Sequence, residues 1–593
     1  MNIDIIMVSY NSEKYIEKCV NSIIKSDYDL KKVGLYFFDN KSSDNSVKVL
    51  KQLKEKNGEK FDKFAIFEGK KNYGFGVANN KASKYARAEY LFFLNIDCEI
   101  YEDTLSKLCD KIKNSNQSQT GIYELRQEIY EHPKYYDPIS GKTKWASGAC
   151  FVMKRELFKK IKGFDKNIFL YCEDVEISFK VRKLGYDIIY LPDIPIIHYS
   201  YTRPYEFKKS QYVNTVPNNL YLRFKYGKIK DIVKGYALYL LFYKDVENNP
   251  EINSSELLQI KKEIKKNKNR MLFRGIKEFI KRIKFIFRQH KVKFDFVGFE
   301  YCGVREGPFY KIKPTNNKPL VSIIVRTCNR PDVLRETLIS IKNQTYKNIE
   351  IVIVEDGKSI SKKMLDEEFS DLNIKYFSFE KNVGRCKAGN KALSMASGKY
   401  LNFLDDDDLF YSDHVETLVG ELENSDYSIC YTTAFETPIV VKSKKPYIYD
   451  VLSEYISVSN EFNMLKLFYC NITPIQSVMF EKKVYEKLGG FDESLDALED
   501  WDLWIRYALK YEFKYIKRTT SIYRVPAKKE DASKRAEFLN KYLEIVKNKY
   551  KDVTFKTNID ELENFVGYYS FLSTTRFSSR LQKIKKILGR KIK

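Results

Sequence analysis

The segment Leu401-Asn402-Phe403-Leu404-Asp405-Asp406-Asp407-Asp408 carries the strongest indication of how this chain folds. An apolar run with strand-forming residues leads directly into four consecutive carboxylates. Four like charges repel one another, so the run predicts a positive partner among them. Hard oxygen ligands of this kind suit Mg²⁺ or Mn²⁺, and such ions commonly bind together with a phosphate group. Taken alone, the run also fits a solvated acidic loop.

A similar segment with fewer acidic residues occurs earlier, as Leu91-Phe92-Phe93-Leu94-Asn95-Ile96-Asp97. Its neighbours recur in the same order. The matches are Asn11 with Asn329, Asp39 with Asp356, Asn72-Tyr73-Gly74 with Asn382-Val383-Gly384, Asn80 with Asn390, Gly163-Phe164-Asp165 with Gly490-Phe491-Asp492, and Glu173-Asp174 with Glu499-Asp500. A repeat this long is the size of a domain and predicts a duplicated domain instead of a solenoid.

Strand and helix patterns alternate along the first copy. Strands are predicted over 3–8, 33–38, 64–67, 90–94, 145–153 and 186–191, and helices over 13–24, 74–88 and 173–184. This alternation is typical of an α/β fold with a mostly parallel sheet, which binds ligands at the carboxyl ends of its strands. Asp39 and Asp97 both lie at such ends.

Length and composition bound the possible classes. A chain of 593 residues exceeds one core, and we expect four parts: domains over 1–225 and 316–548, a helical connector over 226–315, and a tail over 549–593. The net charge of +25 points to an acidic partner such as nucleic acid, anionic lipid or a phosphate-bearing substrate. The ten cysteines are scattered and indicate reduced core residues of a cytosolic protein.

Two basic segments have apolar helical faces. In the connector, Leu272, Ile276, Phe279, Ile280, Ile283 and Phe287 share one face, and in the tail Phe577, Leu581, Ile584, Leu588 and Ile592 do so. Each segment fits an amphipathic helix on an anionic membrane surface. The alternatives are a connector helix packed on a domain and a solvated basic tail.

Each copy presents carboxylates at several strand ends, a glycine-containing loop before a helix, and an acidic pair at a helix start. This set fits a nucleotide-diphosphate substrate. Asp39 or Asp356 can accept a hydrogen bond from a ribose or base. A metal ion on the strand-tip acids can neutralise a departing diphosphate, and the later acidic pair can supply a general base for an acceptor hydroxyl.

With these motifs in order, both halves resemble the inverting glycosyltransferases of family 2 with the GT-A fold, which build bacterial surface polysaccharides. The resemblance covers roughly residues 1–225 and 316–548. A lone Asp-x-Asp is weak evidence, whereas the ordered series of motifs, found twice, is specific.

For the second half, the resemblance implies a complete site. Asp500 is the expected catalytic base; Glu355, Asp356, Asp405 and Asp406 are expected to bind the nucleotide-sugar, and Asp405, Asp407 and Asp408 to hold Mg²⁺ or Mn²⁺. Helix N-terminal charge is the alternative role of Glu499-Asp500. The histidine that family members often carry after the last strand is absent from Ile522-Tyr523-Arg524-Val525-Pro526, which leaves a third metal contact unassigned.

The first half is similar to the rhamnosyltransferase-like branch, which carries Asn-x-Asp at this place. Asp174 is the expected base; Asp39, Asn95 and Asp97 are expected to bind the donor, and Asp97 and His198 the metal. An amide in place of a carboxylate should weaken metal binding. A surface histidine is the alternative for His198.

The resulting hypothesis is a bifunctional glycosyltransferase that uses UDP- or dTDP-linked sugars. Its acceptor would be a glycan or lipid-linked oligosaccharide, and its location cytoplasmic and peripheral, on the inner face of the bacterial membrane. One alternative has only the second domain catalytic and the first binding acceptor. Another is a non-catalytic protein that binds glycan or nucleic acid, although no zinc-finger spacing or RNA-recognition motif supports nucleic acid.

Overall fold

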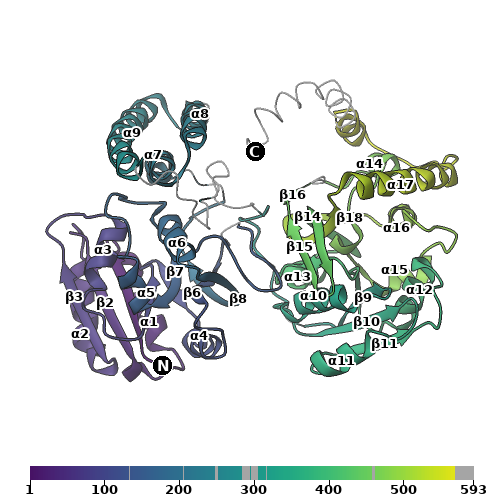
Figure 1. Ribbon diagram of the computed structural model, residues 1–593, viewed down its shortest axis with the longest axis horizontal. Helices are drawn as coiled ribbons and strands as arrows, with labels where there is room; N and C mark the ends of the chain where they lie inside the picture. The colour runs from purple at the N-terminus through teal and green to yellow at the C-terminus, as the bar shows by residue number, and fades with distance from the viewer. Residues whose placement is uncertain are drawn as a thin grey trace. The chain divides into compact units, whose positions relative to one another are not determined.

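The computed structural model describes residues 1–131, 134–204, 206, 208–247, 252–283, 294, 305–315, 317–456 and 461–567. These residues group into two compact units, one within 1–304 and the other within 305–567. Figure 1 shows an α/β architecture in each unit, with helices packed against a central sheet.

The first unit begins with alternating strands and helices and ends in three longer helices. Its elements are β1 (Ile3–Ser9), α1 (Glu13–Ile24), β2 (Val33–Asp39), α2 (Ser46–Asn57), β3 (Lys63–Glu68), α3 (Phe75–Ala82), β4 (Tyr90–Leu94), β5 (Cys98–Ile100), α4 (Thr104–Lys113), β6 (Thr120–Glu128), β7 (Cys150–Lys154), α5 (Arg155–Lys160), α6 (Glu173–Lys183), β8 (Asp187–His198), α7 (Lys209–Tyr226), α8 (Ile229–Glu247) and α9 (Ser254–Ile283).

The second unit repeats this order and adds a hairpin and two helices. Its elements are β9 (Val321–Thr327), α10 (Pro331–Lys342), β10 (Ile349–Glu355), α11 (Lys362–Glu368), β11 (Ile374–Ser378), α12 (Arg385–Met395), β12 (Tyr400–Phe403), β13 (Leu409–Phe410), α13 (His414–Glu423), β14 (Ile429–Lys444), β15 (Tyr447–Val451), β16 (Tyr455–Ile456), α14 (Met464–Tyr469), β17 (Val478–Glu481), α15 (Lys482–Leu488), α16 (Glu499–Ala508), β18 (Phe513–Pro526) and α17 (Lys529–Lys549).

The strand orders of the two sheets correspond one to one. The first sheet runs β3-β2-β1-β4-β7-β6-β8-β5 and the second β11-β10-β9-β12-β17-β14-β18-β13. In both, the first four strands are parallel and the fifth is antiparallel. The predicted duplication of an α/β domain is therefore confirmed, with a mixed sheet in each copy.

Each sheet is buried on both faces, which explains the apolar strands. Alternate side chains of a strand point to opposite faces. Ile5 of β1 accordingly belongs to one apolar core and Ile6 to another, and in β9 Ile323 and Ile324 divide in the same way. A sheet covered on both sides needs such near-continuous hydrophobic strands.

In each unit, one asparagine joins a helix to a turn. Asn80 of α3 donates to the Phe164 carbonyl and accepts from the Phe164 N–H, both at 2.9 Å. Asn390 of α12 bonds Phe491 in the same way, at 3.0 and 2.8 Å. The preceding Gly163 and Gly490 are required because an added Cβ would lie 2.2 Å from the asparagine Oδ1. This asparagine clamp explains the repeated Gly-Phe-Asp motif.

Three elements differ from their predicted bounds by several residues. Strand β7 begins at Cys150 and not at Trp145. Helix α3 ends at Ala82 and not near Ala88, because the Asp4 carboxylate accepts hydrogen bonds from the N–H groups of Arg87 and Ala88. Strand β8 continues past Leu191 to His198, because its second half pairs with β5.

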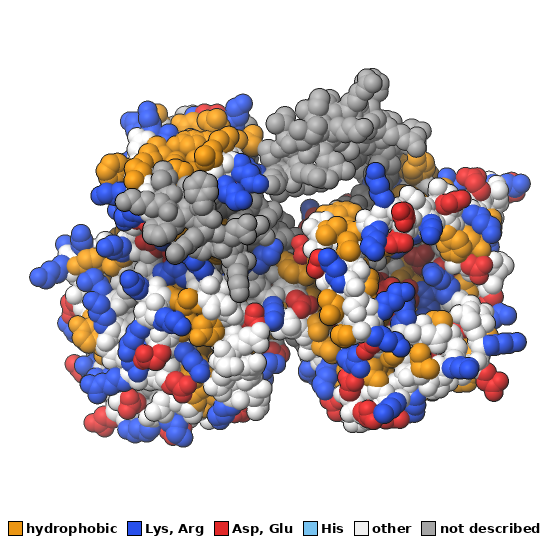
Figure 2. Space-filling view, in the orientation of Figure 1, with side chains coloured by type: hydrophobic (Ala, Val, Ile, Leu, Met, Phe, Trp, Pro, Cys, Tyr) orange, Lys and Arg blue, Asp and Glu red, His pale blue; other side chains and the backbone are white. Residues whose placement is uncertain are grey.

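The helices after the first sheet are partly packed and partly exposed. On α9, Met271 is buried against Tyr221 of α7, whereas Phe273 and Ile280 are 69% and 60% exposed. Figure 2 shows hydrophobic side chains flanked by lysines and arginines over α8 and α9. None of the helices in the part of the chain that the structure describes combines the length and apolar character that a membrane-crossing helix needs. The predicted tail face, Phe577 to Ile592, and Phe287 of the connector lie outside the described residues.

Candidate active site

A cavity of about 560 Å³ lies at the carboxyl ends of the strands of the second unit. Acidic and basic side chains both line it. The acids are Asp356, Asp405, Asp406, Asp407, Asp408, Glu499 and Asp500, and the arginines are Arg326, Arg330, Arg385, Arg524 and Arg535. The candidate base and the strand-tip acids, nearly a hundred residues apart in the sequence, therefore face one space.

Asp500 lies in the first turn of α16, after Leu498, whose φ of 59° is left-handed. Its Oδ1 accepts from the Trp501 N–H at 2.9 Å and its Oδ2 from the Asn471 amide at 2.8 Å. Burial, reinforced by the adjacent Glu499 carboxylate, raises the pKa of Asp500 to about 7. A carboxylate with such a pKa suits a general base at neutral pH.

The four consecutive aspartates point to different partners. Asp405 receives two hydrogen bonds of 2.8 Å from Arg326, whose third nitrogen donates to Glu499 at 2.9 Å. Asp407 is 38% exposed and receives a hydrogen bond of 3.2 Å from Arg330.

The other two aspartates point inward. Asp406 is fully buried, accepts from the Thr327 hydroxyl at 2.7 Å and pairs with Arg330. Asp408 accepts from the Arg524 backbone N–H at 3.1 Å. Burial raises the pKa of Asp406 to about 7 and lifts the pKa of Asp408 well above its usual range.

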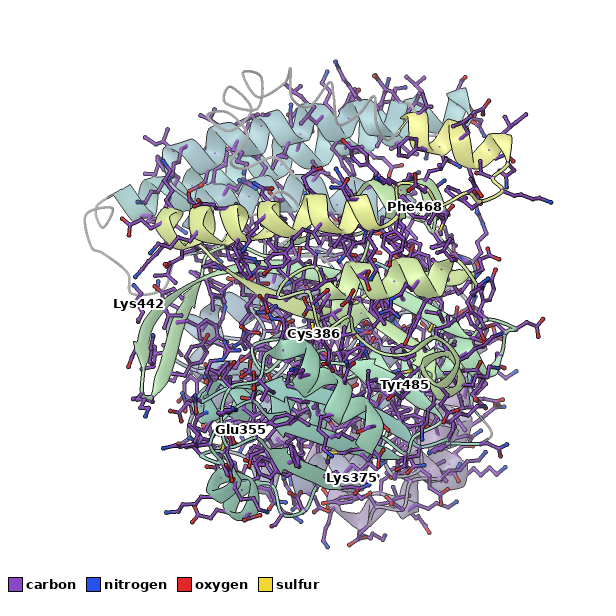
Figure 3. All side chains as sticks on the ribbon, turned by 90° about the vertical axis from the view of Figure 1, so that its right-hand side faces the viewer. Glu355, Lys375, Cys386, Lys442, Phe468 and Tyr485 are labelled. Carbon is purple, nitrogen blue, oxygen red and sulfur yellow. The ribbon has the colours of Figure 1, made fainter. Side chains whose placement is uncertain are left out.

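Of the neighbouring acids Glu355 and Asp356, both expected to bind the nucleotide-sugar, only Asp356 lines the cavity. Its carboxylate accepts from the N–H groups of Val383 and Gly384, at 2.6 and 3.1 Å, and so orders the glycine loop before α12. Glu355 is fully buried and bonds the Ser361 N–H, the Ser361 hydroxyl and the Tyr376 hydroxyl. Glu355 is the last residue of β10 and is labelled in Figure 3, which looks onto the second unit. This placement gives no support to the predicted contact of Glu355 with the nucleotide-sugar.

The register of the sheets corrects one predicted correspondence. Asp39 pairs with Ser9, and Glu355 pairs with Thr327, which matches Ser9. Asp39 therefore corresponds to Glu355 and not to Asp356, whose counterpart is Asn40. The bonds agree, since Asp39 accepts from the Ser42 N–H and hydroxyl at 2.9 and 2.6 Å, as Glu355 does from a serine. The prediction matched carboxylate to carboxylate and missed a shift of one residue.

In the first unit Asp174 repeats the geometry of Asp500. It lies in the first turn of α6 after Cys172, which is also left-handed, with φ 72°. Its carboxylate accepts from the Val175 and Gly148 N–H groups at 2.8 and 3.1 Å, and burial raises its pKa. The neighbouring Glu173 is buried with one carboxylate oxygen that has no hydrogen-bond partner among the described residues, and its pKa is raised well above the usual range by that burial.

Asp97 and His198 come together at the tip of the first sheet. His198 Nε2 lies 3.4 Å from Asp97 Oδ1, and Nδ1 lies 2.7 Å from the Gln127 side-chain oxygen. When Nδ1 donates to Gln127, the Nε2 lone pair faces the carboxylate, an arrangement that favours a cation between them. Asn95, two residues before Asp97, is partly exposed beside them, and its backbone N–H donates to Ala149 at 2.8 Å.

Among the described residues, side chains that could hold a metal ion come together in the first unit only. Ligand atoms of Asp97, Cys98 and His198 all lie within 4.8 Å of one another. No such group of three forms from Asp405, Asp407 and Asp408, because their carboxylates diverge toward the partners described above. The predicted ligand set of the second unit is thus not assembled.

The cavity contains residues that the sequence analysis did not single out. Arg326, Arg330, Arg385 and Asn471 all line it. Aligning the two copies residue by residue would have indicated the arginines, because the first copy has uncharged residues at their positions. No comparable feature of the sequence indicates Asn471.

The paired sheets and strand-tip acids define two α/β domains of nucleotide-sugar transferase type in tandem. The family model of "Glycosyl transferase family 2" matches residues 4–175 and 322–484. The chain therefore belongs to glycosyl transferase family 2 and is a glycosyltransferase with two GT-A domains.

Relatives span archaea and bacteria. An uncharacterized glycosyltransferase of Methanocaldococcus jannaschii is 31% identical over 221 residues, which cover 35% of this chain and 72% of the relative. One of Rickettsia conorii is 24% identical over 540 residues, 88% of this chain and 79% of the relative, so its match extends across both units.

Among solved structures, Staphylococcus aureus TarS is 18% identical, with a TM-score of 0.31 over 45% of this chain and 43% of that one. The mannosyltransferase PcManGT of Pyrobaculum calidifontis, solved with GDP-Man and Mn²⁺, is 16% identical, with a TM-score of 0.32 over 48% of this chain and 88% of that one.

Proposed function

We propose that the chain is a bifunctional inverting glycosyltransferase that adds two sugars to a bacterial surface glycan. The observation that carries the proposal is that Asp500 and the strand-tip aspartates line one cavity. In the second unit, Asp500 takes the proton from the acceptor hydroxyl as that oxygen attacks the anomeric carbon. Asp356 and Asp405 bind the nucleotide part of the donor.

In the first unit, Asp174 is the base and Asn95 contacts the donor. Asp97 and His198 would hold Mg²⁺ or Mn²⁺, which supplies positive charge to the diphosphate. Asp39 orders the loop after β2 by accepting hydrogen bonds from the N–H and hydroxyl groups of Ser42. The domains occupy 1–225 and 316–548, separated by the connector 226–315 and followed by the tail 549–593.

The donors are UDP- or dTDP-linked sugars, and the acceptor is a lipid-linked oligosaccharide at the inner face of the cytoplasmic membrane. The exposed apolar residues of α8 and α9 support this location: Ile229, Val233, Leu240, Leu241, Phe273, Ile276 and Ile280. Basic side chains next to them suit anionic lipid better than nucleic acid.

The decisive experiment is a screen of nucleotide-sugars for hydrolysis and transfer, with Mg²⁺ or Mn²⁺, on the full-length chain and on the Asp174→Asn and Asp500→Asn variants. We expect two donors to be turned over, each lost in one variant. Turnover of a single donor, lost only with Asp500→Asn, would favour a first unit that binds acceptor. Absence of all turnover would favour a non-catalytic glycan-binding protein.

A further inference from the structure

The two sites differ in positive charge at four structurally equivalent positions. Arg326, Arg330, Arg385 and Arg524 stand where the first unit has Val8, Ser12, Phe75 and Tyr199. Thus the second site gains four guanidinium groups on an otherwise shared framework.

Strand register and helix starts fix these equivalences. Arg326 precedes Thr327, which pairs with Glu355 at the end of β10. Val8 precedes Ser9, which pairs with Asp39 at the end of β2. Arg330 and Ser12 are the residues before α10 and α1, and each follows an asparagine in the left-handed region.

The other two equivalences follow in the same way. Arg385 and Phe75 open α12 and α3 after a glycine. The pairing of β13 with β18 and of β5 with β8 aligns Arg524 with Tyr199.

The same alignment places Tyr523 where the first unit has His198. The Tyr523 hydroxyl donates to Glu436 at 2.6 Å and so turns toward another acid. The residue that could complete a metal site with Asp97 in the first unit has no metal-binding counterpart in the second.

Arginines instead hold the carboxylates of the second site. Arg330 contacts both Asp406 and Asp407, and Arg326 bridges Asp405 and Glu499. A divalent ion on Asp407 would lie beside the Arg330 guanidinium, and displacing Arg330 would leave the buried Asp406 carboxylate without its counter-charge. The first site, with Val8 and Asn95, lacks both the bridging arginine and the acid that it holds.

A guanidinium group can do the work that the ion does for a diphosphate. Its planar fork matches phosphate oxygens with two hydrogen bonds and keeps its charge at any physiological pH. Of the four arginines compared here, Arg330 and Arg385 are accessible, with side chains 47% and 54% exposed beside the cavity. Arg330 can exchange its bond to Asp407 for one to a phosphate oxygen while it still bonds Asp406.

We propose that the second unit neutralises the leaving diphosphate with arginines, Arg330 first, and without a divalent ion, whereas the first unit uses an ion held by Asp97 and His198. This inference rests on the proposed nucleotide-diphosphate donors.

The first test counts bound Mn²⁺ on the full-length chain from the loss of the free-ion electron paramagnetic resonance signal, with the metal alone as probe. We expect one ion per chain, lost with His198→Ala and retained with Asp407→Asn. Any other pattern overturns the proposal, whether two ions, none, or one ion that survives His198→Ala or is lost with Asp407→Asn.

The second test measures inorganic pyrophosphate binding by calorimetry in EDTA. We expect the wild-type chain to bind, and Arg330→Ala to weaken binding at least tenfold. The control is Arg335→Ala in α10, the helix that Arg330 precedes; Arg335 pairs with Glu368 outside the cavity, so this variant should change nothing. Equal binding by both variants, or no binding by the wild type, contradicts the role of Arg330. Because the donor screen measures turnover, a second-unit activity that requires metal would leave the proposed function standing while this inference fails.

Discussion

Asp500 has a position and a raised pKa that suit the proposed role of general base for an oxygen nucleophile. Its carboxylate is fixed at both oxygens, by a backbone N–H and by the Asn471 amide, and it lines the cavity. Replacing it with asparagine keeps the shape and removes proton acceptance. We expect Asp500→Asn to lower the kcat of second-unit transfer about 10²–10⁴-fold while nucleotide binding survives. Normal turnover in this variant, with kcat measured from product formation, would contradict its assignment as base.

The pKa of Asp500 sets a pH dependence. Only the deprotonated carboxylate can accept a proton, and burial raises its pKa to about 7. Transfer by the second unit should therefore rise about tenfold per pH unit below pH 7 and level off above it. The pH profile of kcat/KM, measured in the Asp174→Asn background, checks this.

Glu499 offers a control for that profile. Its charge contributes to the raised pKa of Asp500, so Glu499→Gln should move the rise in rate to lower pH. A profile that stays in place, or shifts upward, would separate the observed pH dependence from Asp500.

At the scale of the elements, the asparagine clamp joins the helix after the glycine loop to the turn that precedes α6 in the first unit and α16 in the second. Asn80→Ala and Asn390→Ala each remove two hydrogen bonds to a main-chain segment. We expect each to cost about 1–3 kcal/mol in the unfolding free energy of its own unit. Thermal or urea unfolding of the full chain measures this, with Ser394→Ala on the exposed side of α12 as the control. Loss no greater than in the control would show that packing alone holds the turn.

The elements themselves were largely predictable, because period-2 and helical patterns and repeated motifs are local signals. The predicted bounds of α1 and β4 agree with the structure. The end of α3 was not predictable, because it depends on Asp4, a residue distant in the sequence. The hydrogen-bond partners of Asp405 to Asp408 were likewise not predictable, because four identical side chains in a row do not indicate which partner each one contacts.

At the scale of the whole molecule, the two sites should lay down different linkages. They differ at Asn95 and Asp405, at His198 and Tyr523, and at the four arginines, so their donors should differ too. We expect the Asp174→Asn and Asp500→Asn variants to lose different products when glycan products are analysed by mass spectrometry. If both variants lose the same single linkage, the chain does not use two donors.

Membrane association would involve the exposed face of α8 and α9. Replacing Phe273 and Ile280 with glutamate should remove apolar contact and add repulsion from anionic lipid. We expect reduced flotation with phosphatidylglycerol-containing liposomes, and a smaller loss on deleting residues 577–593. The matched control is Ile545→Glu and Phe538→Glu, at exposed positions on α17 of the other unit. Equal loss in both pairs would mean that binding is not specific to α8 and α9.

The asparagine clamp also bears on how such a chain can evolve. The hydrogen bonds that both copies share go to main-chain atoms of Phe164 and Phe491, so exchanges among cavity side chains leave them intact. After gene duplication, each copy could drift at its substrate-facing positions without losing the ability to fold. Val8 occupies the position in the first unit that Arg326 occupies in the second, and Ser12 the position of Arg330. Such differences between the two copies are what this drift would produce.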